Sequence, residues 1–213
     1  MKKIVVIIAV LFFGVIQAQD VAIVKYDGGG DWYANPTAVP NLIAFCNENI
    51  NTKLTKTPKV VELDNVELFN YPIIFMTGHG NIFFDENTIE NLQNYLTSGG
   101  FLHISDNYGL DKYVRREFKK VFPELEFKEV PYTHPIYHQT YDFDEGVPKI
   151  HEHDGKAAQG LGLFYEGNLV CFYDYESDLS DGWESQAVHN NPPAIRLKAL
   201  QMGANIIQYA FTN

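Results

Sequence analysis

Residues 71–109 read YPIIFMTGHGNIFFDENTIENLQNYLTSGGFLHISDNYG and carry the strongest structural signal in the chain. The segment opens with an apolar run over 71–77, which is typical of a parallel strand covered on both faces. Apolar residues then recur at helical spacing from 89 to 96, and Gly99-Gly100 predicts the end of that helix. A second buried strand follows at 101–105, so the segment predicts a βαβ unit.

The polar residues after these two strands form the first candidate site. Strands joined by a crossover helix run parallel, and the loops that follow them leave the sheet at the same edge. Those loops contain His79 and Asn81 after the first strand, and Asp106 and Asn107 after the second. Ligands of open α/β sheets bind at that edge. We therefore expect these four side chains to line one crevice.

Apolar patterns outside this unit predict the remaining elements. Strands are expected over residues 21–26, 59–63, 126–130, 160–165 and 168–175, and helices over 39–49, 110–122 and 194–209. The turn at Glu166-Gly167 predicts that the last two strands form a β-hairpin. The fold class is therefore α/β, with a mainly parallel sheet, helices on both faces and the hairpin of residues 160–175 at one edge.

The N-terminus has the pattern of a secretory signal peptide. Lys2 and Lys3 precede an apolar run over 4–16, and the small residue Ala18 precedes the expected cleavage point. We expect residues 1–18 to be removed and residues 19–213 to form one exported domain, either periplasmic or secreted. The apolar run is too short to span a bilayer comfortably, and no second candidate span follows. A buried first strand is the alternative interpretation.

The charge balance disfavours polyanionic partners. The formal net charge is −11, and it becomes −13 without Lys2 and Lys3, since 14 basic residues then face 27 acidic ones. The densest basic group, Arg115-Arg116 with Lys119-Lys120, has the spacing of one solvated helix face. Binding to nucleic acid or to anionic membrane surfaces is therefore not expected.

Two cysteines, Cys46 and Cys171, lie inside apolar patterns. Export permits a disulfide between them, but two cysteines do not make a disulfide framework. A buried free cysteine behaves as a small hydrophobe, so two buried thiols are the favoured interpretation.

Strand ends and one later loop supply the candidate binding residues. The expected ligand-binding set is Asp27, Asp31, Trp32, His79, Asn81, Asp106, Asn107 and His134. Carboxylates and imidazoles at one rim suit acid–base chemistry or a divalent metal, for which His79, Asp106 and His134 are the candidates. The structural alternatives stay open, since His79 can hydrogen-bond a turn, and Asp106 and Asn107 can cap a helix. The Trp32 ring can stack on a sugar ring of a ligand, or it can form part of a small satellite core.

Residues 131–160 show no sustained period and contain four histidines. A connection of this length usually carries function or is disordered. His151 and His153 can place two imidazoles on one side of an extended segment, but no established zinc signature is matched. Solvated histidines on a loop are the favoured interpretation, and His134 is the best functional candidate among the four.

Six motifs together resemble the bacterial family known as domain of unknown function 4159. They are YDGGGDWY (26–33), TGHG (77–80), GGFLHISDNYG (99–109), HPIY (134–137), DLSDGW (178–183) and MGANIIQYAFT (202–212). That family looks like a branch of the class I glutamine amidotransferase-like superfamily. The resemblance implies a flavodoxin-like three-layer fold over residues 19–213.

The resemblance also implies where an amidotransferase-like enzyme carries its nucleophilic cysteine, which is a strained turn after a central strand. The position that looks equivalent here is the end of 101–105, which reads His103-Ile104-Ser105-Asp106 and has no cysteine. Thiol chemistry of the glutaminase type is therefore not expected. Ser105 also lacks the flanking glycines of a serine nucleophile elbow.

The leading function hypothesis is an exported domain that binds a glycan or another small polar ligand without covalent catalysis. One alternative is a metal-assisted or acid–base hydrolase of a glycan or amide. Another, implied by the resemblance, is a structural or adaptor module with partners in a cell-envelope complex. Whether the chain is an enzyme stays open at this point; no cofactor is required by these alternatives, and a divalent metal is the one that the hydrolase alternative allows.

Overall fold

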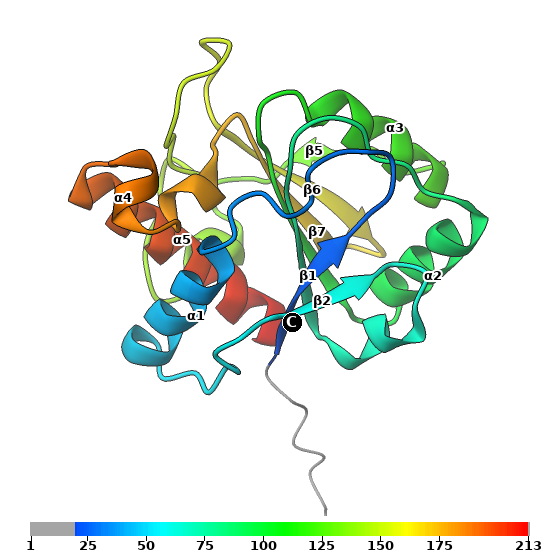
Figure 1. Cartoon of the computed structure of the whole chain (residues 1–213), viewed down its shortest axis with the longest axis horizontal. Helices are drawn as coiled ribbons and strands as arrows, with labels where there is room; N and C mark the ends of the chain where they lie inside the picture. Colours follow the sequence, from blue (N-terminus) through cyan, green and yellow to red (C-terminus); the bar gives the residue numbers. More distant parts are fainter. Residues whose placement is uncertain (1–19, 213) are drawn as a thin grey trace, which may run out of the picture.

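A computed structural model describes residues 20–212 and shows a seven-stranded sheet between two layers of helices (Figure 1). The expected signal peptide over 1–18 lies outside the described residues. The strands are β1 (Val21–Lys25), β2 (Lys59–Glu62), β3 (Ile73–Met76), β4 (Phe101–Ser105), β5 (Lys128–Glu129), β6 (Gln159–Tyr165) and β7 (Asn168–Tyr175). The helices are α1 (Ala38–Asn49), α2 (Glu86–Thr97), α3 (Asp111–Val121), α4 (Gln186–His189) and α5 (Pro193–Thr212), with short 3-10 helices η1 (Val66–Asn70), η2 (Pro135–Tyr137) and η3 (Leu179–Gly182).

The strand order is β2-β1-β3-β4-β7-β6-β5, and the first five strands of that order are parallel. This is the doubly wound order of flavodoxin-like folds, so the predicted fold class and the βαβ unit β3-α2-β4 are confirmed. The predicted hairpin forms β6 and β7. Its expected place at the sheet edge is wrong, because β7 pairs with β4 inside the sheet and β5 pairs outside β6.

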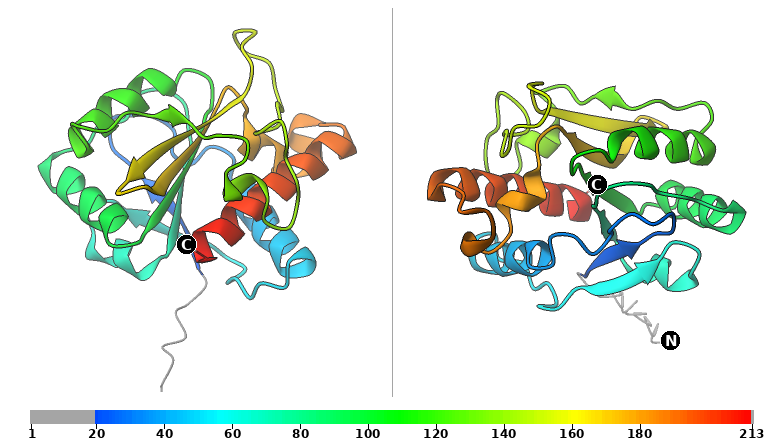
Figure 2. Two further views of the ribbon diagram at one scale, coloured as in Figure 1. Left: turned by 180° about the vertical axis from the view of Figure 1, so that it is seen from behind. Right: turned by 45° about the horizontal axis from the view of Figure 1, so that its top comes forward.

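The sheet buries a separate apolar cluster on each face, as parallel strands covered on both sides require. One cluster joins α1 and α5 to strand residues such as Ile73 and Phe172. The other joins α2 and α3 to their strand neighbours, such as Ile74 and Cys171. Figure 2 shows the two helical layers from behind and in a view tilted by 45°, with the top brought forward.

One tryptophan ties the segment after β7 to both the sheet and α5. The side chain of Trp183 is fully buried, and its Nε1 donates a hydrogen bond of 2.8 Å to the carbonyl of Ala199. Its ring packs against Phe75 on β3 and His103 on β4, at centroid distances of 5.6 and 5.4 Å. A Cβ added at Gly203 would lie 2.8 Å from the Trp183 ring, so glycine at 203 leaves room for this anchor.

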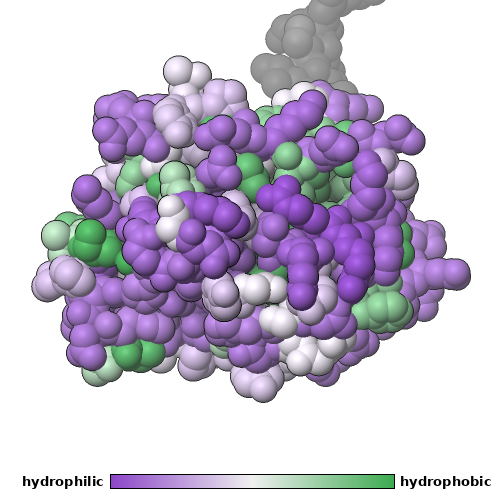
Figure 3. Space-filling view, turned by 90° about the horizontal axis from the view of Figure 1, so that it is seen from above, coloured by the Kyte–Doolittle hydropathy of each residue, from purple (hydrophilic) through white to green (hydrophobic). Residues whose placement is uncertain are grey.

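The parallel strands end towards the top of Figure 1, and the surface seen from that side is largely hydrophilic (Figure 3). Among residues 20–212, no helix combines the length and the apolar character needed to cross a bilayer.

The two cysteines are free and buried on opposite faces of the sheet, which confirms the favoured interpretation of two thiols. Burial raises the pKa of Cys46 to about 12 and that of Cys171 well above its usual range. Because the thiolate is the reactive form, neither group should react with a chromogenic thiol reagent in the native protein at pH 8. We expect two reactive thiols per chain in denaturant. Fast reaction of either thiol without denaturant would contradict these positions.

Candidate functional site

The loops that follow β1 and β3 are hydrogen-bonded to each other. The amides of Gly30 and Asp31 donate to the carbonyls of Asn81 and His79, at 3.0 and 3.2 Å. The Asp31 carboxylate accepts from the His79 backbone amide, and its Oδ2 lies 3.0 Å from His79 Nδ1. The structure therefore brings Asp31, His79 and Asn81 together as expected, but Asp31 and His79 bind each other.

The three consecutive glycines at 28–30 allow the two loops to approach each other this closely. A Cβ added at Gly30 would lie 2.7 Å from the His79 carbonyl oxygen, and Gly28 has φ +115°. Asn81 Nδ2 donates to the carbonyl of Gly28, and the carbonyl of Asp27 accepts from the amide of Phe83.

Trp32 packs on the apolar cluster that includes α2 and α3, and its ring meets Tyr33 edge to face at 5.6 Å. This contact favours the satellite-core interpretation of Trp32 over a ligand platform.

His134 does not reach this edge of the sheet, so that expectation is wrong. Its ring lies 5.3 Å from Tyr209 and 6.0 Å from Phe164, and Phe164 pairs with Leu169 at the start of β7. β5 has only two residues, and the buried side chains of η2 then fix the chain at the opposite edge. His134 Nδ1 accepts from the amide of Ile136, and burial lowers the pKa of His134, so the ring acts there as a neutral cap.

Asp106 and Asn107 lie at the end of β4 and are 4% and 2% exposed. They do not cap α3 with their side chains, because the N-cap of that helix is Leu110. Asp106 Oδ2 accepts from the amide of Glu176 at 3.1 Å, whereas Asp106 Oδ1 and Asn107 Nδ2 are buried without a hydrogen-bond partner. Burial, followed by the negative charge of Asp174, raises the pKa of Asp106 to about 7.

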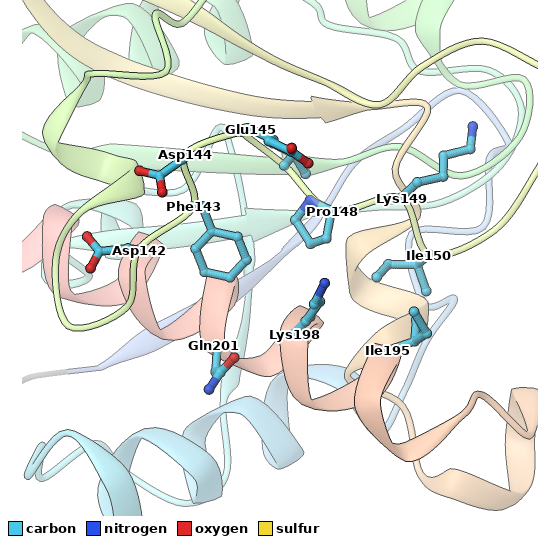
Figure 4. Close-up of a pocket in the computed structure, with 12 residues that line it drawn as sticks. Asp142, Phe143, Asp144, Glu145, Pro148, Lys149, Ile150, Ile195, Lys198 and Gln201 are labelled. Carbon is cyan, nitrogen blue, oxygen red and sulfur yellow. The ribbon is translucent and has the colours of Figure 1, made fainter.

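Asp106 lines a cavity of about 290 Å³ at this edge. The other lining residues are Tyr108, Gly109, Asp111, Lys112, His153, Asp154, Lys156, Tyr175 and Glu176. A larger cavity of about 500 Å³ lies between residues 142–150 and α5 (Figure 4). Within residues 20–212, some buried side-chain atoms have no hydrogen-bond partner. Two residues with such atoms, Asp106 and His153, line the smaller cavity, and none lines the larger one. The smaller cavity is therefore the better candidate site.

A buried polar network on β4 and β7 supports this edge. Asp174 Oδ2 lies 2.6 Å from His103 Nε2, and Asp174 Oδ1 accepts from Ser105 Oγ at 3.1 Å and from the amide of Leu179 at 3.3 Å. Burial lowers the pKa of His103 to about 3 and raises that of Asp174 well above its usual range. The pair therefore holds one proton and no net charge. Ser105 Oγ also accepts from the amide of Ser180.

This network holds the segment 176–181, which presents two further carboxylates to the long 131–160 connection. Asp181 Oδ2 lies 3.0 Å from His151 Nδ1 and 3.7 Å from His189 Nε2. Asp178 Oδ2 contacts His153 Nε2. The interpretation of His151 and His153 as solvated loop residues is therefore wrong, since each packs against a carboxylate.

The sequence reasoning missed Asp174, Asp178, Asp181 and His189 as site residues. The DLSDGW motif contains two of them and was the available signal. Its pairing with His151 and His153 joins segments about 25 residues apart with no regular element in common, so no local period could have predicted it.

The chain belongs to the family described as domain of unknown function (DUF4159), whose model matches residues 20–211. A comparison with curated proteins finds no match.

Two histidine–aspartate pairs allow a matched test of burial. Asp174→Ala leaves the neutral ring of His103 buried without its partner, and we expect it to lower the free energy of unfolding by about 1 to 3 kcal/mol. His79→Ala breaks a pair whose side chains are 52% and 35% exposed, and should cost less than about 1 kcal/mol. Urea unfolding followed by tryptophan fluorescence measures both. Equal losses in the two variants would contradict the structural role of Asp174.

The raised pKa of Asp106 predicts a pH-dependent stability difference between the wild type and Asp106→Asn. The folded state holds this proton up to about pH 7, whereas the unfolded chain releases it near pH 4. Stability from this group is therefore complete below pH 4 and is lost as the pH rises through 7. Asp106→Asn keeps an acceptor but cannot ionise, so we expect it to be more stable than the wild type by about 2 to 4 kcal/mol at pH 8. The difference should vanish near pH 4 in parallel denaturant titrations, and a constant difference across pH would contradict the assignment.

Proposed function

We propose that this member of the DUF4159 family is an exported, non-thiol binding protein for a glycan or another small polar ligand. The ligand binds in the 290 Å³ cavity beside Asp106. One observation carries the proposal, namely that Asp106 lines this cavity while its Oδ1 is buried without a hydrogen-bond partner. An unsatisfied buried oxygen costs free energy, and a hydroxyl or amine of a ligand removes that cost by donating to it.

The remaining lining residues suit a polar ligand that has one flat apolar face. Tyr108 is 59% exposed, and its ring stacks on His153 at a centroid distance of 5.2 Å. Aromatic faces of this kind pack against sugar rings. Lys112 and Lys156 add donors at the rim, so the cavity offers both donors and acceptors to a polyhydroxylated compound.

In this proposal, the lysine, carboxylate and tyrosine side chains that line the cavity bind the ligand without forming a covalent bond to it. The amidotransferase-like ancestry that the motifs suggest places the reactive position at the end of β4, where Ser105 stands. Ser105 Oγ is fully buried and is occupied by Asp174 and the amide of Ser180. Because Ser105 is fully buried, a ligand in the cavity does not reach its Oγ, which supports binding over acyl transfer.

An acid–base hydrolase acting on the same ligand class is the second candidate, favoured by the pKa of Asp106. A carboxylic acid with a pKa of about 7 is matched to proton transfer at neutral pH. This candidate predicts turnover with a bell-shaped pH profile, whereas simple binding predicts none.

The test is a thermal-shift screen of mono- and oligosaccharides, amino sugars and other small polar compounds, with calorimetry on every compound that stabilises the protein. We expect Asp106→Ala and Tyr108→Ala each to weaken binding at least tenfold, since they remove the free acceptor and the aromatic face. His79→Ala changes the neighbouring loop pair without touching the cavity and serves as the matched control. Binding that survives both cavity variants, or that is lost equally in His79→Ala, would overturn the proposed site.

A further inference from the structure

Three potential metal ligands from separate segments converge beside the proposed ligand cavity. His151 comes from the long connection, Asp181 from η3, and His189 from the last residue of α4. One ligand atom of each residue lies within 4.8 Å of those of the other two. Ligand atoms bound at about 2.0 to 2.2 Å to a shared ion are about 3 to 3.5 Å apart in tetrahedral or octahedral geometry. From Asp181 Oδ2, the separation of 3.0 Å to His151 Nδ1 lies in that range, and the separation of 3.7 Å to His189 Nε2 lies slightly above it.

The hydrogen bonds of His151 select the form of the ring that binds a metal. Asn191 Nδ2 donates to the backbone carbonyl of Asp181 at 3.4 Å, so the Oδ1 of Asn191 is the atom that faces His151 Nε2 at 2.8 Å. His151 Nε2 must therefore carry a hydrogen and donate it. In the neutral ring this leaves a lone pair on Nδ1, pointed at Asp181. Histidines that ligate metals are oriented in the same way, by a bond from the other ring nitrogen.

That lone pair faces two acceptors rather than a donor. His151 Nδ1 lies 3.0 Å from Asp181 Oδ2 and 3.7 Å from Asp178 Oδ2. Two carboxylate oxygens and a nitrogen lone pair repel one another unless a cation lies among them. A metal ion bound to His151 Nδ1 and Asp181 Oδ2 removes this repulsion.

Asp178 lies beside this group and pairs with a different histidine. Its side chain is 1% exposed, and its Oδ2 contacts His153 Nε2. Its backbone is left-handed at φ 54°, which is uncommon for a residue other than glycine. Asp178 does not belong to the set of ligand atoms that lie within 4.8 Å of one another, so the ion would be held by His151, Asp181 and His189.

The other oxygen of Asp181 is already engaged. Asn35 Nδ2 donates to Asp181 Oδ1 at 2.6 Å, and the same amide donates to Ser180 Oγ at 2.7 Å. This bond orients the carboxylate so that Oδ2 points to the two imidazoles. Asn35 and Asn191 thus act as positioning residues around the three ligands.

We propose that His151, Asp181 and His189 form a binding site for one divalent transition-metal ion. Imidazole nitrogens with carboxylate oxygens suit Zn²⁺ and related first-row ions, whereas Ca²⁺ and Mg²⁺ prefer oxygen ligands alone. The site differs from the candidates His79, Asp106 and His134, which the structure does not bring together. It adjoins the proposed ligand cavity through His153, but it does not depend on a ligand there.

The test is calorimetric titration of the purified chain, without a polyhistidine tag and after removal of metals with a chelator. We expect one Zn²⁺ per chain, a higher melting temperature with Zn²⁺, and no heat with Ca²⁺ or Mg²⁺ at the same concentrations. His151→Ala and His189→Ala should each weaken Zn²⁺ binding at least tenfold. His138→Ala is the matched control, because His138 Nδ1 also lies 3.0 Å from one carboxylate, that of Asp142. It should leave Zn²⁺ binding unchanged.

A second pair of variants tests the tautomer argument. Asn191→Leu removes the acceptor for His151 Nε2 and should weaken Zn²⁺ binding about tenfold, whereas Asn191→Asp keeps an acceptor and should restore it. Melting curves of the metal-free variants establish that each one folds. The proposal is overturned if the wild type binds no stoichiometric Zn²⁺, which would mean that a proton on His151 separates the carboxylates. It is equally overturned if neither histidine variant weakens binding, or if His138→Ala weakens it as much.

Discussion

The carboxyl edge of the sheet depends on one buried acid, Asp174, and on the need to satisfy it. An isolated carboxylate in an apolar interior is too costly to persist, so its neighbours must supply protons and donors. His103 and Ser105 on β4 meet this need from the adjacent strand, and the amide of Leu179 meets it from the segment that follows. That last bond folds the chain after β7 back over the strand ends. A requirement of the core thereby sets the path of a surface segment.

The folded-back segment divides this edge into two unlike halves. On one side, backbone hydrogen bonds and the pair Asp31–His79 join the loops after β1 and β3. The polar atoms that form these contacts are therefore paired within the protein and do not need a ligand. On the other side Asp106 and Asp178 keep buried oxygens without hydrogen bonds. Stability alone would not retain such atoms, because a small apolar residue costs less at a buried position. The second half is therefore where we place the proposed binding site.

How much of this structure can be predicted from the sequence depends on how far apart along the chain the interacting residues lie. The βαβ unit is local, since the apolar periods of β3, α2 and β4 lie within residues 71–109, and the structure matches them closely. His103 and Asp174 are 71 residues apart, and each looks like part of an apolar strand until the other is placed beside it. The glycines at 28–30 allow a close approach of another segment, and only the structure shows that this segment is the His79 loop. His134 was misplaced because a β5 of two residues gives no direction to the connection that follows it.

Charge explains why the unsatisfied half gathers imidazoles. Asp106, Asp174, Glu176, Asp178 and Asp181 meet at one edge of a chain whose net charge is −11. Carboxylates so close together repel one another unless protons or cations offset their negative charge. The acids at this edge are neutralised in different ways. The deepest acid shares a proton with His103, and burial keeps Asp106 protonated up to about pH 7. Asp178 is 1% exposed and contacts His153, whereas Asp181 faces His151 and His189. Protons suffice for the first two acids, whereas the geometry around Asp181 suits the divalent cation proposed above.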